Sequence, residues 1–202
     1  MSLTLAWSLL GLVIAAYWLR VARMARKARR NAGASAHFIP PEKLGRRLRL
    51  VWVPVIFIWI AHPFVSAAVH HPVPLVAPLW ISPACAWTGL ALAAMSFIAT
   101  IFCWRQMGRS WRMGIDPGER TPLITSGAFA ILRHPIYALS QTMMAGTIIA
   151  LPTPLLILIA TLHIFLLHWE ARREERHMIR LHGDVYQQYR QRVGGFIPKV
   201  RP

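Results

Sequence analysis

Residues 51–69 read VWVPVIFIWIAHPFVSAAV, a run of 19 residues without Asp, Glu, Lys or Arg. About 20 apolar residues are enough for a helix to cross the hydrocarbon core of a bilayer. Apolar runs without these charged residues also occupy residues 3–19, 81–104 and 136–169. Over the whole chain 55% of the residues are hydrophobic and 15% are charged, whereas a typical soluble domain carries about 25% charged residues. The sequence therefore predicts an all-α integral membrane protein.

The last apolar run, residues 136–169, is too long for one crossing and is interrupted by Leu151-Pro152-Thr153-Pro154. Two prolines this close together favour a turn between helices. We interpret the run as a hairpin of two short helices, which gives about five transmembrane helices in a single membrane domain over residues 1–202. The first three spans lie within residues 1–104.

Two amphipathic helices are expected behind the hairpin. The first covers residues 169–182, which have helical composition and end before Gly183. Asp184 is placed to cap a second, short helix. Its apolar stripe would consist of Val185, Tyr186, Tyr189 and Val193. Such helices suit the membrane surface, or a position folded back against the loop over residues 105–130.

Positive charge is distributed unevenly along the chain, which carries 23 Lys and Arg against 7 Asp and Glu. All 23 cations lie in residues 20–50, 105–135 and 170–202, which five spans place on one side of the membrane. Because cytoplasmic loops are enriched in Lys and Arg, this predicts an outside N-terminus and a cytoplasmic C-terminus, as in a bacterial inner membrane protein. Residues 20–50 become a basic cytoplasmic connector. Attraction to anionic lipid explains the basicity, so membrane lipid and not nucleic acid is the expected partner. The pattern indicates no oligomeric state.

Several chemistries lack their sequence signals. No pair of histidines has the i, i+4 spacing of a helical zinc site, and neither cysteine has a histidine at ligand spacing, so no metal site is expected. No P-loop, G-x-S-x-G elbow or G-x-G-x-x-G fingerprint is present. The spans hold no Asp, Glu, Lys or Arg in their interiors, which counts against an ion-coupled transporter.

A candidate pocket remains where residues 127–137 lead into the hairpin. Arg133, His134 and Tyr137 supply polar groups at this boundary, and Glu174 and Glu175 could form the opposite wall. A carboxylate there would make charge-assisted hydrogen bonds to an ammonium group or to ribose hydroxyls. Two glycines, Gly127 and Gly146, would admit a planar group. The same residues also fit a purely structural interpretation, in which His134 is a hydrogen-bonded histidine at the membrane interface and Glu174 and Glu175 lie on a solvated helix face.

Two motifs in order carry a family resemblance. TSGAFAILRHPIYAL at residues 125–139, followed by EERHMIRLHGDVYQQYRQRVGGFIP at residues 174–198, resembles the isoprenylcysteine carboxyl methyltransferase family and its bacterial relatives. The resemblance implies a membrane enzyme that transfers a methyl group from S-adenosylmethionine to a lipophilic acceptor, without a Rossmann domain. Residues 105–202 would be its catalytic half.

The resemblance also implies which residues bind S-adenosylmethionine. His134, Pro135, Tyr137 and Glu174 match positions that contact the cofactor, and Gly146 and Thr147 match positions that line its pocket. With the neighbouring polar and glycine residues, the predicted cofactor set is Gly127, Arg133, His134, Pro135, Tyr137, Gly146, Thr147, Glu174 and Glu175.

Three positions depart from the family pattern. Leu139 stands where a glycine is frequent, Gly194 where a proline is usual, and Glu170 where many members carry an arginine associated with the acceptor. Arg173 is near Glu170 but is expected on another face of the helix. The catalytic residue is therefore unassigned, with Glu170 and Arg173 as candidates. A neutral or cationic acceptor is favoured at least as much as a carboxylate. Phospholipid amine N-methylation and a non-enzymatic, ligand-binding relative remain the alternatives.

Overall fold

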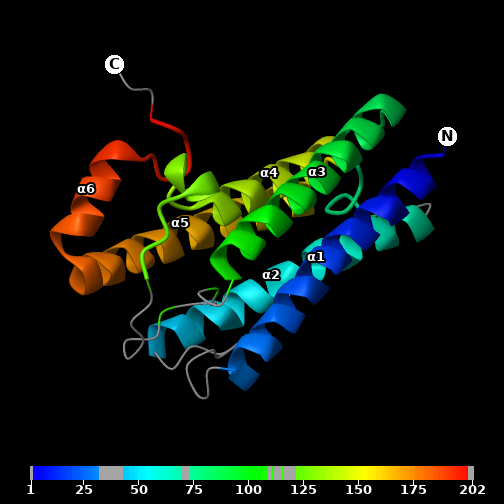
Figure 1. Ribbon diagram of the computed structural model, residues 1–202. Helices are drawn as coiled ribbons and strands as arrows, with labels where there is room; N and C mark the ends of the chain where they lie inside the picture. The colour runs from blue at the N-terminus through cyan, green and yellow to red at the C-terminus, as the bar shows by residue number, and fades with distance from the viewer. Residues whose placement is uncertain are drawn as a thin grey trace.

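The computed structural model describes residues 2–31, 43–69, 73–108, 111, 115 and 122–199, and this part of the chain is helical with no strand (Figure 1). Residues 32–42 of the predicted basic connector therefore lie outside the described part. The helices are α1 (Leu3–Asn31), α2 (Lys43–Ala68), α3 (Pro83–Met107), α4 (Pro135–Ala150), α5 (Pro154–His182) and α6 (Asp184–Arg192), and the 3-10 turn η3 (Gly127–Ala130) precedes α4.

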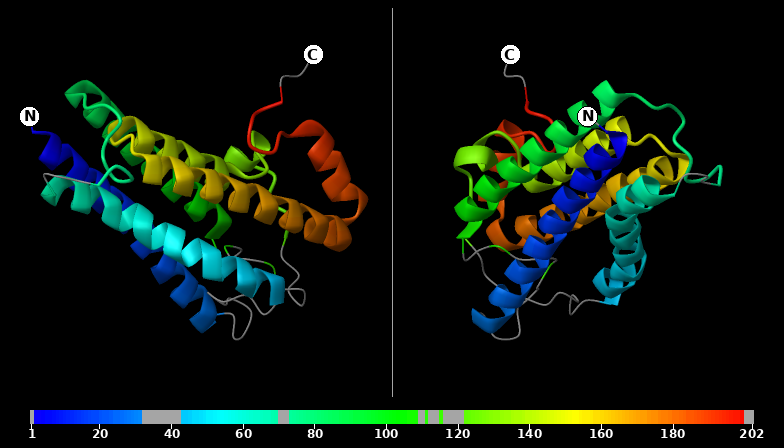
Figure 2. Two further views of the ribbon diagram at one scale, coloured as in Figure 1. Left: turned by 180° about the vertical axis from the view of Figure 1, so that it is seen from behind. Right: turned by 90° about the vertical axis from the view of Figure 1, so that its right-hand side faces the viewer.

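Among the described residues, four helices are long and apolar enough to cross a membrane: α1, α2, α3 and α5. The predicted all-α membrane architecture is thus confirmed. α4 has 16 residues, fewer than the roughly 20 that a full crossing needs. It lies alongside α3, while α1 lies alongside α2 (Figures 1 and 2).

Close packing of α3 against α4 depends on two glycines that face one another. A Cβ atom added to Gly146 would lie 2.7 Å from the carbonyl oxygen of Gly89. Small residues at membrane helix contacts allow the backbones to approach in this way. The neighbouring Thr147 is completely buried, and its hydroxyl accepts a hydrogen bond from Trp59 Nε1 at 3.0 Å. Gly146 and Thr147 therefore take part in helix packing, and neither lines the two described pockets. Their role in the cofactor pocket stays a prediction.

The hairpin turn is at the predicted place, but its second arm is not short. Thr153 caps α5, because its hydroxyl accepts from the backbone N–H of Leu156 at 3.2 Å and contacts His62 Nε2 at 2.8 Å. From there α5 continues for 29 residues to His182. The predicted separate helix over residues 169–182 is its continuation, because no glycine or proline interrupts residues 155–182.

The short helix α6 turns back from the far end of α5 toward η3 (Figure 2). Tyr186, Tyr189 and Val193 form its buried stripe, as predicted, but Val185 is 62% exposed. The spacing i, i+3, i+7 places the three buried residues on one face, and Val185 is rotated away from it by about 100°. Asp184 is the first residue of α6, and no hydrogen bond from its side chain caps the helix.

Candidate functional site

The start of α4 is joined to the C-terminal segment of the described chain. Pro135 occupies the first turn of α4, where its missing N–H leaves no hydrogen bond unmade. The two preceding N–H groups are bonded: Arg133 donates to the carbonyl of Gly194 at 2.8 Å and His134 donates to that of Gly195 at 3.1 Å. Main-chain pairing therefore fixes the position of both polar side chains.

Glu175 connects α5 to this junction. Its Oε1 accepts from Arg133 Nη2 at 2.7 Å and Nε at 2.9 Å, and lies 3.1 Å from His134 Nε2. The other carboxylate oxygen lies 3.4 Å from Arg190 Nε on α6. Arg133 also donates to the carbonyl of Val193. One carboxylate thus holds α4, α5 and α6 together, and Glu175 does not itself line a described pocket.

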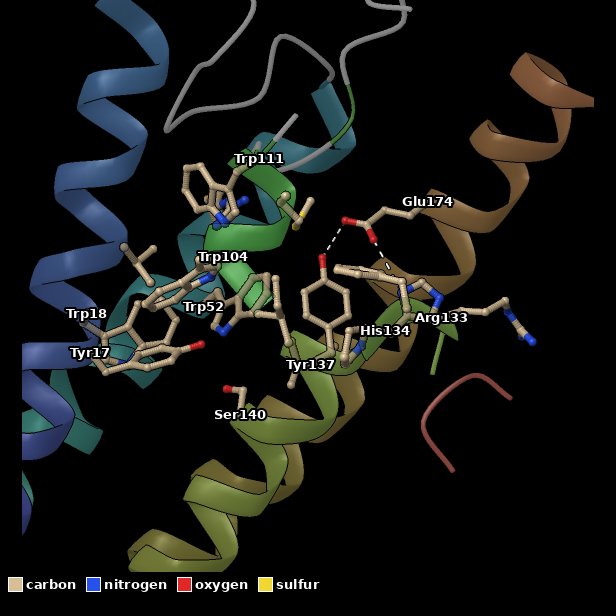
Figure 3. A pocket seen from close by; sticks show the side chains of 17 residues that line it. Tyr17, Trp18, Trp52, Trp104, Trp111, Arg133, His134, Tyr137, Ser140 and Glu174 are labelled. Carbon is tan, nitrogen blue, oxygen red and sulfur yellow. Dashed lines mark hydrogen bonds and ion pairs between the residues drawn. The ribbon is translucent and has the colours of Figure 1, made fainter. Parts of the chain in front are cut away.

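Glu174 faces the other way, toward the 127–147 segment. The hydroxyl of Tyr137 donates to its Oε1 at 2.5 Å, and His134 Nδ1 lies 3.7 Å from its Oε2 (Figure 3). The rings of His134 and Tyr137 are stacked, with centroids 5.7 Å apart and planes 4° apart. Phe196 stacks on His134 at 5.5 Å. The structure therefore assembles a carboxylate, a phenol and an imidazole in one place.

A first pocket opens beside Glu174, and its empty volume of about 770 Å³ includes open solvent at its mouth. The RHP-x-Y motif forms one wall through Arg133, His134, Pro135 and Tyr137. The opposite wall is aromatic and comes from the first three helices (Figure 3). It includes Tyr17 and Trp18 of α1, Arg49 and Trp52 of α2, and Trp104 of α3, together with Trp111.

A buried histidine orients a hydroxyl in this first pocket. Trp52 Nε1 donates to His163 Nδ1 at 3.1 Å, so in the neutral ring the proton is on Nε2. That nitrogen lies 3.0 Å from Ser140 Oγ and donates to it. Ser140, which lines the pocket, therefore directs its own proton away from His163. His163 therefore positions the Ser140 hydroxyl and cannot accept its proton, because the lone pair on Nδ1 already accepts the hydrogen bond from Trp52 Nε1.

A second pocket of the same size lies on the side of α6. Tyr186 and Tyr189 line it, as do His177 of α5 and residues 122–124. The Tyr189 hydroxyl donates to the carbonyl of Phe129 at 2.5 Å, and burial raises the pKa of Tyr189 to about 12. Burial likewise raises the pKa of Tyr186. Both phenols therefore remain protonated donors at neutral pH.

The two pockets share five lining residues: Met107, Phe129, Arg133, His134 and Glu174. The carboxylate of Glu174 and the ring of His134 thus stand where two cavities meet. Such an arrangement can hold two ligands with their reactive ends together.

The two candidate catalytic residues pair with one another outside these pockets. Glu170 and Arg173 are buried, 4% and 7% exposed, and form an ion pair. The expectation that Arg173 lies on another face was wrong, because residues at i and i+3 are neighbours on a helix. Neither residue lines a described pocket. Glu170 therefore does not present an unpaired negative charge to an acceptor.

The remaining predicted cofactor residue, Gly127, lies at the edge of the site without lining a described pocket. Its φ of +54° suits glycine. It opens η3, where the amide of Gln106 donates to the carbonyl of Ser126 and accepts from the N–H of Ala128 at 3.2 Å. The acids Asp116 and Glu119 of the preceding loop lie outside the described residues.

Sequence reasoning missed the wall supplied by α1, α2 and α3. The available signal was an aromatic residue near the basic end of each span: Trp18, Trp52 and Trp104. Tryptophan is enriched at membrane interfaces in general, so this signal does not separate a pocket wall from an interfacial anchor.

Comparison with known families agrees with this geometry. A family model described as phospholipid methyltransferase matches residues 84–185, which is half of the chain. The match begins in α3 and ends in α6, and includes the RHP-x-Y motif and both glutamates. This family and the isoprenylcysteine carboxyl methyltransferases belong to one clan of membrane methyltransferases, so the resemblance noted from the motifs is confirmed at that level. No curated protein and no solved structure gave a match.

Proposed function

The chain belongs to the phospholipid methyltransferase family, and we propose that it transfers a methyl group from S-adenosylmethionine to a lipophilic acceptor, the amine of a membrane phospholipid being the favoured one. The observation that carries the proposal is Glu174, which is held by Tyr137 at the junction of two pockets. The family description supports a phospholipid acceptor.

The residues at the junction fit S-adenosylmethionine. This cofactor carries a sulfonium, an ammonium group and ribose hydroxyls, and Glu174 offers a carboxylate to such groups. Aromatic rings attract cations through their faces, and Phe129 lines both pockets where they meet. His134, Tyr137 and Glu174 would hold the cofactor. When bound, it supplies a methyl group already activated by the positive sulfur.

The two pockets suggest where each ligand enters. Helices α1 to α3, all long enough to span a membrane, line the first pocket, which therefore suits a lipophilic acceptor arriving from the bilayer. Residues 122–124 and α6 line the second pocket, which suits a water-soluble cofactor. In the orientation predicted from the charge distribution, both pockets would open on the cytoplasmic side.

The protein's contribution to the reaction would be proximity and exclusion of water. Two ligands held end to end at the pocket junction would react as if in one molecule. Aromatic side chains such as Trp52 and Trp104 would keep water from the reacting atoms. For an amine acceptor, the Glu174 carboxylate lies where it could accept the proton that the amine must lose.

Calorimetry on the detergent-solubilised full chain tests cofactor binding. We expect S-adenosylmethionine to bind, and Glu174→Ala or His134→Ala to weaken binding by more than about 1 kcal/mol through lost charged hydrogen bonds. Asp184→Asn is the matched control, because it removes a negative charge from an exposed residue of α6. Absence of binding to monodisperse protein, or equal losses in the control, would refute the cofactor assignment.

Labelling identifies the acceptor. Membranes containing the protein are incubated with methyl-labelled S-adenosylmethionine and the lipids are extracted. Label in phospholipid that disappears with Glu174→Ala supports the amine acceptor. Label found only in another lipophilic fraction would contradict the phospholipid assignment while leaving methyl transfer intact.

A further inference from the structure

Arg49, in the first turns of α2, is a buried cation that the proposed reaction does not use. Its side chain is 8% exposed and it lines the first pocket together with Tyr137 and Glu174. A buried arginine normally requires an ion pair or hydrogen bonds, since an uncompensated charge away from water is costly. Its neighbours Arg46 and Arg47 are exposed.

Within the described part of the chain, no ion pair or hydrogen bond engages the Arg49 guanidinium. The carboxylates whose charges act on it from a distance are Glu170 and Glu174. Both are already occupied: Glu170 pairs with Arg173, and Glu174 accepts from the Tyr137 hydroxyl. The positive charge of Arg49 thus has no direct counterion.

One contact orients the guanidinium. It lies over the Trp52 ring, with Cζ 5.1 Å from the ring centroid. A cation–π contact of this kind needs no conventional hydrogen bond, so the N–H donors of the guanidinium remain available for a planar or tetrahedral oxyanion. Trp52 lines the same pocket, so the available donors belong to the cavity assigned to the acceptor.

We propose that Arg49 binds an anionic group, a phosphate or a carboxylate, carried by the methyl acceptor. The inference rests on the proposed function, because it assigns a charge to the acceptor of that reaction. It also changes what Glu170 implies about the acceptor. Position 170 lacks the arginine that many relatives carry there, but Arg49 of α2 supplies a cation to the pocket, so an anionic group on the acceptor has a partner. A zwitterionic acceptor would then place its anionic group at Arg49 and its amine nearer to Glu174.

A binding experiment that needs no methyl transfer tests the role of Arg49. Dodecyl phosphate and dodecanol, which share one alkyl chain, are titrated into the full chain in neutral detergent, and tryptophan fluorescence is followed because Trp52 contacts Arg49. We expect the phosphate to bind roughly tenfold or more tightly than the alcohol. Arg49→Gln should abolish this preference. Arg47→Gln, which removes the same charge from an exposed position of α2, should retain it.

Either of two outcomes overturns the proposal: a preference that survives in Arg49→Gln, or one that falls equally in Arg47→Gln, which would indicate general attraction to a basic surface. If Arg49→Gln does not fold, Arg49→Lys decides. Lysine keeps the charge but lacks the planar fork, so phosphate affinity should fall about three- to tenfold, and an unchanged affinity overturns the proposal.

S-adenosylmethionine also carries a carboxylate, so its affinity is measured by calorimetry in the same variants. We expect Arg49→Gln to leave it unchanged. A loss as large as that for dodecyl phosphate would assign Arg49 to the cofactor and overturn the acceptor assignment. Because the alkyl ligands are tested without turnover, failure of this proposal is distinguishable from failure of the proposed methyl transfer.

Discussion

Two adjacent glutamates should respond to the same substitution in opposite ways. Glu175→Gln removes the charge that joins Arg133, His134 and Arg190, in an ion pair whose Arg133 and Glu175 side chains are only 12% and 16% exposed. Breaking a buried pair by removing one partner costs about 3–5 kcal/mol. Gln still accepts one hydrogen bond and the pair is partly exposed, so we expect a loss of about 2–3 kcal/mol in the free energy of unfolding.

Glu174→Gln should cost less than about 1 kcal/mol in stability, because its side chain is 29% exposed and the Tyr137 hydroxyl can still donate to an amide oxygen. For the affinity of the cofactor, the effect of Glu174→Gln should be the larger of the two. Glu174→Gln removes a charge that faces the ligand, whereas Glu175→Gln acts on the ligand only through the position of His134.

Thermal unfolding in detergent, followed by tryptophan fluorescence, measures the first effect. For a chain of about 200 residues, 2–3 kcal/mol corresponds to a fall of roughly 5–10 °C in the melting temperature. Calorimetric titration with S-adenosylmethionine measures the second. Equal destabilisation by the two substitutions, or an unchanged melting temperature in Glu175→Gln, would refute the division into a structural and a ligand-facing glutamate.

Two further predictions concern packing. Tyr189→Phe removes a buried hydrogen-bond donor and should lower the free energy of unfolding by about 1–2 kcal/mol. Since the pKa of Tyr189 is raised from 10.0 to about 12 in the folded state, the stability advantage of the wild type should be complete below pH 10 and lost as the pH rises through 12. Unfolding measured at a series of pH values checks this. Gly146→Leu should separate α4 from α3 and lower the free energy of unfolding by about 1–3 kcal/mol or more. Ala145→Leu, which places the same side chain at an exposed position, should change the melting temperature little. Reduced cofactor affinity of Gly146→Leu at unchanged stability would instead support a place for Gly146 in the cofactor pocket.

Local chemistry made part of the site predictable. The RHP-x-Y motif needs only a proline at a helix start and polar residues beside it, so Arg133, His134 and Tyr137 were found within one turn of each other. The pairing of this motif with Glu174 was implied by the resemblance of the two motifs to the methyltransferase family. The roles of Glu174 and Glu175 did not follow, because neighbours on a helix point about 100° apart and only the packing of α5 against α4 decides which one faces the pocket.

Residues distant in sequence were not predictable in the same way. Arg49 and Trp52 reach the site because α2 packs against α5, and nothing in their own segment distinguishes a pocket wall from a membrane interface. Gly146 shows the related point that a glycine permits close approach of any group, and the group that approaches it in the structure is Gly89 on α3.

The all-α membrane class, the first three spans and the turn at residues 151–154 could be predicted from the sequence, because hydrophobic length and proline act over short stretches of chain. The lengths of the last two helices could not. The two motifs, whose chemistry is local, also indicated the clan of membrane methyltransferases to which the chain belongs. The tertiary structure alone decided which charges are paired, where the two pockets meet and that a cation on α2 enters one of them. These depend on how helices lie against one another, and helical periodicity gives each helix its faces without saying which neighbour each face will meet.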